Sequence, residues 1–229
     1  MAIATEHVVD LASTPLRELN QRLHDAEHGR FRIVNPNGAH AVACGIKAQL
    51  EVEIVGHVGY YCAGMNQRAH VRVRGNVGTG VAENIMSGSV VVEGNASQSA
   101  GATGRGGLVV IHGDAAARCG ISMKGVDIVV RGSIGHMSAF MAQRGCLVVC
   151  GDAGDALGDS IYEAHIYVRG STAGLGADCI EKALKEHHVD ELRSLLEAAG
   201  FDDLDPAEFR RYGSARQLYN FKIDNAGAY

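Results

Sequence analysis

The amino-acid sequence predicts an all-β solenoid: a single-stranded parallel β-helix of about eight 19-residue coils, with short helices at both ends. Three observations support this fold. A glycine recurs every 19 residues, branched aliphatic residues stand at fixed positions before it, and a small residue stands at a fixed position after it. A row of this length is too short for a helix plus two strands. Strands stacked about 4.8 Å apart would give a solenoid roughly 38 Å long.

The glycine column contains seven residues separated by equal steps: Gly56, Gly75, Gly94, Gly113, Gly132, Gly151 and Gly170. We predict that each forms a structural corner, where the backbone either adopts φ > 0 or approaches a neighbouring row closely. The residue after each glycine is polar, as is typical of turns: His57, Asn76, Asn95, Asp114, Ser133, Asp152 and Ser171.

Aliphatic residues precede each glycine by four and by two positions, a spacing that predicts a short strand with one buried face. The first set is Val52, Val71, Val90, Val109, Ile128, Leu147 and Ile166, and the second is Ile54, Val73, Val92, Ile111, Val130, Val149 and Val168. These columns should fill the axis of the solenoid. Small residues seven positions after the glycine predict a second corner: Ala63, Ala82, Gly101, Gly120, Ala139, Gly158 and Ala177. Ile33, Asn37 and Cys44 extend the columns into a degenerate first row.

Three parts are expected along the chain: an N-terminal capping helix within 1–30, the β-helix over 31–179, and C-terminal helices with an extended tail over 180–229. The first helix, over about 15–28, should cover the open first coil, although a partner-binding helix is the alternative. After the repeat, composition predicts helices over 180–188, 190–199 and about 206–212, and then an extended apolar tail over 214–229.

Charge, targeting segments and cysteine usage exclude several classes of function. The net charge of −5 without a basic stripe argues against binding to nucleic acid or to an anionic membrane. We see no signal peptide and no transmembrane stretch, and therefore expect a cytoplasmic protein. Six cysteines without a CxxC pair are expected to be reduced thiols packed as small hydrophobes. A metal pair formed by Cys146 and Cys150, on the outward side of one strand, is the alternative.

One outward column changes from charged to apolar along the solenoid. Three positions before the glycine, Glu53 and Arg72 are followed by an apolar stripe: Val91, Val110, Val129, Val148 and Tyr167. Such a stripe is a candidate interface, covered either by the chain's own C-terminal helix or by a partner. The tail residues Tyr219, Phe221 and Tyr229 are further interface candidates, packed on the solenoid or inserted into another subunit.

The sequence carries no recognisable catalytic motif. We find no nucleophile elbow, P-loop, dinucleotide fingerprint or metal spacing in its proper context, and we predict no catalytic, cofactor-binding or metal-ligating residue. Arg74, Glu93 and His112 would be neighbours on adjacent rows, where a solvated charge ladder is the simplest interpretation and a ligand or proton-relay site the alternative. The residues by themselves therefore indicate a scaffold or an interaction surface.

The repeat resembles a known family. Its rows, such as Gly56-His57-Val58-Gly59 and Gly132-Ser133-Ile134-Gly135, are similar to the GXGXG domain that closes the large subunit of glutamate synthase. In that family the domain is a right-handed β-helix, and the resemblance covers essentially residues 8–180. The tail, with Phe209-Arg210-Arg211-Tyr212-Gly213-Ser214, Leu218-Tyr219-Asn220-Phe221 and Asp224-Asn225, resembles the free-standing subunit of N-methylglutamate synthases (methylamine–glutamate N-methyltransferases).

The resemblance implies a noncatalytic structural subunit of a hetero-oligomeric, glutamate-synthase-like complex that makes N-methylglutamate from glutamate and methylamine. One partner would be a glutamine-amidotransferase-like subunit, and another an FMN-binding subunit with an iron–sulfur cluster. No cofactor is expected on this chain. Alternatives are a subunit of another glutamate-synthase-like complex, a β-helix like the one in formylmethanofuran dehydrogenase, and an autonomous β-helix that binds or cleaves a ligand.

Overall fold

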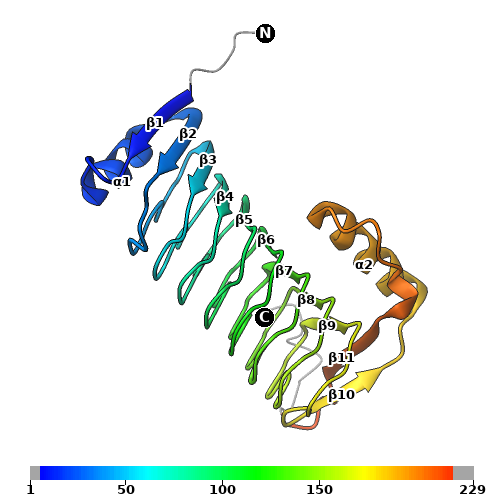
Figure 1. Cartoon of the computed structure of the whole chain (residues 1–229). Coiled ribbons are helices and arrows are strands. Elements are labelled where there is room, and N and C mark those ends of the chain that lie inside the picture. Colours follow the sequence, from blue (N-terminus) through cyan, green and yellow to red (C-terminus); the bar gives the residue numbers. More distant parts are fainter. Residues whose placement is uncertain (1–5, 219–229) are drawn as a thin grey trace, which may run out of the picture.

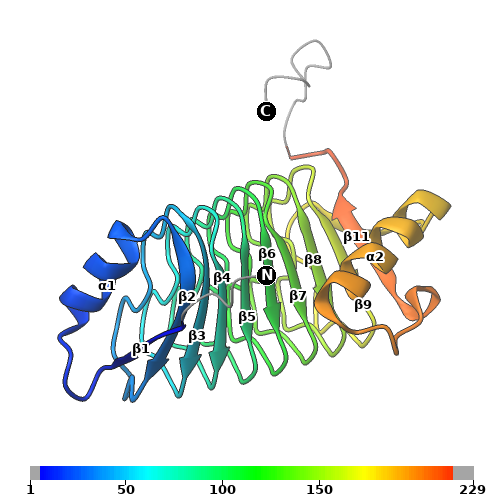
Figure 2. The same cartoon turned by 90° about the horizontal axis from the view of Figure 1, so that it is seen from above.

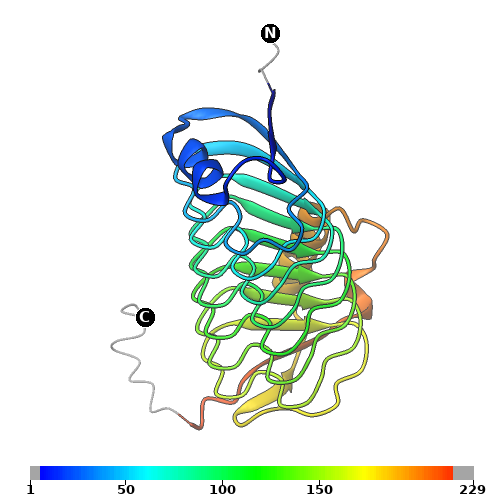
Figure 3. The same ribbon diagram turned by 60° about the vertical axis from the view of Figure 1, so that its left-hand side comes forward.

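A computed structural model describes residues 6–218 and shows a parallel β-solenoid of about seven turns, which confirms the predicted fold class (Figure 1). The strands β1 to β9 stack in chain order in one sheet. Their bounds are β1 Glu6–Asp10, β2 His28–Val34, β3 Gln49–Val55, β4 His70–Arg74, β5 Ser89–Val92, β6 Leu108–Ile111, β7 Asp127–Val130, β8 Cys146–Val149 and β9 His165–Val168. Figure 3 shows each coil lying directly on the previous one.

From β3 to β9 the strands pair in register at 19-residue steps, as Val52 with Val71 and Val71 with Val90 illustrate. A second line of bridges joins the opposite wall of the coils, from Val58 to Val77 and onward to Thr172. Both aliphatic columns point inward and are buried in one continuous core. The axis is therefore packed with branched side chains, as the sequence predicts.

Close packing between rows, rather than backbone conformation, accounts for the glycine column. Of its seven members only Gly56 has a positive φ, of 129°. A Cβ atom on Gly113 would lie 2.1 Å from Oδ1 of Asn95 and 2.8 Å from the carbonyl oxygen of Gly94. Asn95 stands there because its Oδ1 accepts the backbone N–H of Asp114, at 2.8 Å, one row further on. The polar residue of one row thus occupies the space that a side chain in the next row would need.

The small-residue column forms the second corner, as predicted. Six of its members have left-handed backbone conformations, with φ between 53° and 68°: Ala63, Ala82, Gly101, Gly120, Ala139 and Gly158. The side chain has to be small because the column faces the packed interior: a Cβ on Gly101 would lie 2.5 Å from Cδ1 of Ile128, and Ala63, Ala82 and Ala139 are 0% exposed.

The first row is longer than predicted. Phe31 pairs with Val52 and Ile33 with Ile54, so paired residues are 21 positions apart rather than 19. Placing Ile33 in the column of Val52 was therefore wrong by two residues. One additional residue lies in the turn after β2, where Asn35 and Asn37 adopt positive φ values of 54° and 47°, and the other lies between Ile46 and Leu50, at the start of β3. Asparagine tolerates this conformation, and the turn can therefore be lengthened without glycine.

The N-terminal end is capped as expected. The helix α1 (Leu16–Asp25) buries Leu19 and Leu23 against the first coil, where Figure 2 shows it beside β2. The side chain of Asn20 fixes this position by bonding the Ala41 carbonyl oxygen at 2.9 Å and the Ala43 N–H at 3.0 Å. The strand β1 was not predicted. It pairs in parallel with β2 and lengthens the sheet beyond the expected start of the β-helix.

The C-terminal end departs from prediction. It contains β10 (Cys179–Lys182), α2 (Glu186–Ala199), the 3₁₀ helix η1 (Pro206–Glu208) and β11 (Arg210–Ser214). The helix predicted over 180–188 is wrong over 180–185, which form most of β10 and the loop to α2, and that over 206–212 is wrong from residue 209. Antiparallel pairing decides both cases, because β11 closes the open edge of β9 and β10 then pairs with β11. In the described part of the chain, no helix is both long and apolar enough to cross a bilayer.

Candidate functional site

The apolar stripe is covered by the chain's own helix. Val110, Val129, Val148 and Tyr167 are at most 1% exposed and pack in a second hydrophobic cluster with Leu192 and Leu196 of α2. The alternative of a partner surface is therefore wrong for these four residues, because burial within the chain already satisfies them. Val91 lies at the margin of α2 and is half-buried. The remaining interface candidates, Tyr219, Phe221 and Tyr229, lie outside the described residues.

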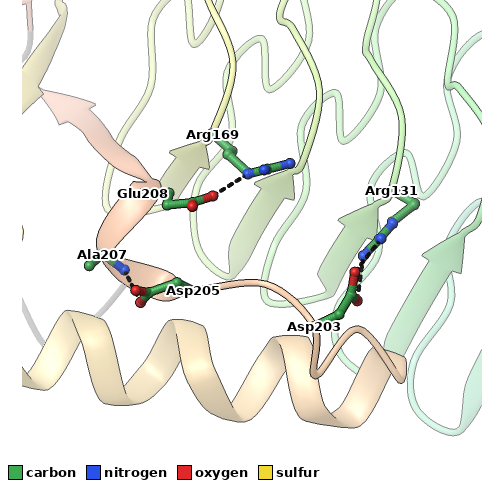
Figure 4. A network of polar contacts seen from close by, with 6 residues as sticks. All are labelled: Arg131, Arg169, Asp203, Asp205, Ala207 and Glu208. Carbon is green, nitrogen blue, oxygen red and sulfur yellow. Dashed lines mark hydrogen bonds and ion pairs between the residues drawn. The ribbon is translucent and has the colours of Figure 1, made fainter.

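The segment after α2 is anchored to the sheet by charged groups. Both terminal guanidinium nitrogens of Arg131 reach the Asp203 carboxylate, at 2.9 and 2.6 Å (Figure 4). The ring centroid of Phe201 lies 5.1 Å from the same guanidinium group. Two rows further on, Arg169 pairs with Glu208 at 2.6 Å. The two-pronged contact of Arg131 fixes the orientation of the segment, and the second ion pair fixes its direction along the solenoid.

A cluster of polar side chains lies beneath α2, beside the valine stripe. Asp127, Cys146 and His165 occupy the same position on three consecutive strands, five residues before the glycine. Glu191 of α2 lies over them, with Oε2 accepting the Tyr167 hydroxyl and lying 2.8 Å from Nδ1 of His165. The thiol of Cys146, a ring nitrogen of His165 and a carboxylate oxygen of Glu191 lie within 4.8 Å of one another. We call these five residues the Cys146 cluster.

The electrostatics of the Cys146 cluster follow from burial and from two carboxyl groups. Burial and the neighbouring charges of Asp127 and Glu191 raise the pKa of the Cys146 thiol above its usual range. Burial also raises the pKa of Asp127. For Glu191, hydrogen bonds from Tyr167 and His165 outweigh burial and lower the pKa of the carboxyl. Glu191 is consequently the ionised acceptor of the cluster, and the thiol is protonated.

The adjoining imidazole is held neutral. Burial and the positive charge of Arg211 lower the pKa of His188 to about 4. Its ring centroid lies 5.3 Å from that of His165, and its Nδ1 accepts the backbone N–H of Lys185, at 3.1 Å, at the start of α2. His188 therefore fixes the first turn of the helix that carries Glu191.

Replacing Tyr167 by phenylalanine should lower the free energy of unfolding by about 1–2 kcal/mol. A hydrogen bond to an ionised acceptor contributes about 1.5–3 kcal/mol, and partial exposure of Glu191 reduces this. Because the pKa of Glu191 is lowered, the loss should be complete above about pH 4.3 and should fade as the pH falls through that lowered pKa.

Urea unfolding at several pH values measures this loss. The matched control is Tyr212→Phe, because the buried Tyr212 hydroxyl has no hydrogen-bond partner among the described residues and its removal should cost nothing. Equal losses for the two tyrosines would show that the Glu191 contact is not stabilising.

The charged end of the sheet is a solvated ladder of ion pairs. Glu53 bridges Arg32 and Arg74, while Glu93 pairs with Arg72 at 3.0 Å. The predicted run of Arg74, Glu93 and His112 is therefore divided among different partners, and His112 instead contacts the edge of the Phe201 ring. Pairs as exposed as these contribute little stability. The shallow hollow beside them, of about 310 Å³, is lined mostly by charged side chains.

Sequence reasoning missed the Cys146 cluster. Cys146 was considered only together with Cys150, and the column of His165, five residues before the glycine, was not followed. That column reads Glu51, His70, Ser89, Leu108, Asp127, Cys146 and His165, and its last three members are all metal-ligating types. The signal was therefore present in the repeat, whereas the contribution of Glu191 depends on how α2 folds back.

Comparison with known proteins places the chain in a family. A scan against protein-family models finds no match. Protein GlxC from Rhizobium meliloti (strain 1021) is 63% identical over 226 residues, which cover 97% of this chain and 99% of that protein. The whole repeat lies within the matched length, and the chain therefore belongs to the GlxC protein family.

Proposed function

We propose that this protein is a noncatalytic structural subunit of a glutamate-synthase-like, FMN-dependent complex that makes N-methylglutamate from glutamate and methylamine. The observation that carries the proposal is the GXGXG repeat, which runs in register through the solenoid and resembles the C-terminal domain of the glutamate synthase large subunit. The match to Protein GlxC over nearly the whole chain supports the coarser part of this proposal, a glutamate-synthase-like subunit.

The packing of the solenoid supports a role without chemistry at its axis. The inward columns are aliphatic and fully buried, so neither substrate nor flavin has room between them. Partners would therefore meet the outer walls. Exposed apolar side chains on the two rows that follow Gly56 and Gly75 are suited to this contact: Tyr60, Tyr61, Met65 and Met86.

In the proposed complex the chemistry belongs to the partners. The glutamine-amidotransferase-like subunit and the FMN-binding subunit would together exchange the amino group of glutamate for methylamine and release ammonia, a net reaction that needs no external oxidant or reductant. FMN and an iron–sulfur cluster would be held by the second of these subunits. This chain would hold the two subunits together.

Purification of the tagged full-length chain from its native host tests the proposal. We expect two larger subunits and FMN to co-purify, and the complex to form N-methylglutamate when given glutamate and methylamine. The same chain expressed alone should bind no flavin and show no turnover. Stoichiometric FMN on the isolated chain would contradict the assignment of FMN binding to a partner subunit. A complex that uses ammonia but not methylamine would instead indicate another glutamate-synthase-like enzyme.

A further inference from the structure

We propose that Cys146, His165 and Glu191 form a binding site for a divalent transition metal ion, with Zn²⁺ as the ion that this donor set favours. The site does not depend on the proposed complex, because all three ligands belong to this chain. It would fasten α2 to the sheet at strands β8 and β9.

The fold brings the three donors together from separate parts of the chain. Cys146 and His165 are directly paired on adjacent parallel strands, and Glu191 reaches them from the overlying helix. Their ligand atoms lie within 4.8 Å of one another. Around a tetrahedral Zn²⁺ with bonds of about 2.0–2.3 Å, ligand atoms would be about 3.3–3.8 Å apart. Nδ1 of His165 and Oε2 of Glu191 are only 2.8 Å apart, so a bound ion would replace their direct contact.

The donor chemistry selects the ion. A thiolate and an imidazole favour Zn²⁺ and similar transition metals, whereas Mg²⁺ and Ca²⁺ prefer sites made only of oxygen. Three protein ligands leave a fourth position for water. The side chains of His165 and Glu191 are 30% and 36% exposed, so an ion can reach the site from solvent.

Asp127 and Tyr167 lie next to the three proposed ligands and can orient them by hydrogen bonds. Oδ1 of Asp127 accepts the backbone N–H of Cys146 at 2.9 Å, which holds a second carboxyl group beside the thiol. The Tyr167 hydroxyl orients the Glu191 carboxylate. Two carboxyl groups next to a thiol place negative charge where a divalent cation would compensate it, and the cation would displace the thiol proton. Arg211 and His188 are the basic groups that face this cluster.

Hydrogen bonds alone, without a metal ion, explain only part of the arrangement of the Cys146 cluster. Glu191 could tie α2 to the sheet through Tyr167 and His165 alone. The Cys146 thiol can also hydrogen-bond Glu191, but a thiol is a weak donor and adds little to such a contact. Asp127 accepts the backbone N–H of Cys146, yet its carboxyl group is partly buried near the charge of Glu191. A bound cation would balance both carboxyl groups and would use the thiol as a ligand.

Cobalt binding to the tag-free, full-length chain tests the proposal. After removal of metal with a chelator, Co²⁺ is titrated while the thiolate-to-cobalt charge-transfer absorption and the visible bands of tetrahedral cobalt are recorded, and Zn²⁺ affinity is then obtained by competition. We expect one equivalent of Co²⁺, displaced by one equivalent of Zn²⁺. Zinc should also raise the thermal unfolding midpoint.

Two variants locate the site. Cys146→Ser should abolish the charge-transfer band and weaken binding more than about 100-fold, since even loss of an outer-shell partner costs about 10–100-fold. Asp127→Asn removes only an outer-shell carboxylate and should therefore weaken cobalt binding by about 10–100-fold. The matched control is Cys150→Ser, which alters the other buried cysteine of the same outward face and should retain the full spectrum.

Circular dichroism shows whether each variant is folded. His165→Asn provides a second test: because the thiolate ligand remains, the thiolate-to-cobalt charge-transfer band should persist, while the affinity for Co²⁺ should fall. The proposal would be overturned if the folded wild-type chain bound no cobalt. It would also be overturned if Cys146→Ser left the spectrum unchanged, or if Cys150→Ser removed the band as completely as Cys146→Ser.

Discussion

Gly113→Ala is expected to lower the free energy of unfolding by about 1–3 kcal/mol, the usual cost of forcing an extra carbon into a packed interior. The new Cβ would meet Oδ1 of Asn95 at 2.1 Å and the Gly94 carbonyl oxygen at 2.8 Å. Moving Asn95 away would break its hydrogen bond to the next row, and the backbone contact would remain. Urea unfolding followed by far-ultraviolet circular dichroism measures the loss.

Gly213→Ala is the matched control for this prediction. Gly213 lies in β11, and an added Cβ there would find its nearest atom, on the Lys182 side chain, at 3.6 Å. Alanine should be neutral or slightly stabilising, because glycine in a strand carries an entropic cost of about 0.5–1 kcal/mol. Similar destabilisation at both positions would mean that the close approach between rows is not what excludes a side chain at Gly113.

Val129→Lys is expected to release α2 from the sheet. Val129 is 0% exposed and packs in the cluster that includes Leu192 and Leu196. An unpaired ammonium group left in that position would cost roughly 3–5 kcal/mol, so displacement of the helix is the less costly outcome. Hydrogen exchange should show loss of protection over residues 186–199, while the strands of the solenoid keep theirs.

Val91→Lys separates this effect from a general response to charge. Val91 occupies the same column two rows earlier, but it lies half-buried at the margin of α2 and follows Arg72 in the column. Its ammonium group can reach solvent, so α2 should keep its protection. If Val129→Lys also left α2 protected, the helix would not depend on the apolar stripe for its position.

The repeat made most of the fold predictable. A period of 19 residues, together with two aliphatic columns, determines strand positions, register and core without reference to the rest of the chain. The prediction failed where the period is absent. The two additional residues cannot be seen in a row that lacks the glycine of the column, and Ile33 was therefore assigned to a column two positions away from its true partner.

The C-terminal end shows a second limit. Residues 180–182 have a helical composition, yet they form β10 because β11 presents an unpaired edge to them. Local preference is weak compared with the hydrogen bonds that such an edge offers. The Cys146 cluster was missed for a related reason: its column is visible in the repeat, but Glu191 joins it only through the return of α2 over the sheet.

The unbroken 19-residue step has a consequence for how proteins of this kind can change in size. Each row pairs with its neighbours and offers the same edge above and below, so removal or duplication of one whole row preserves the pairing of the rows that remain. Each such event would move the two ends of the molecule by one strand spacing, about 4.8 Å. The length of such a solenoid can therefore change in whole rows while its cross-section and the packing of its interior stay the same.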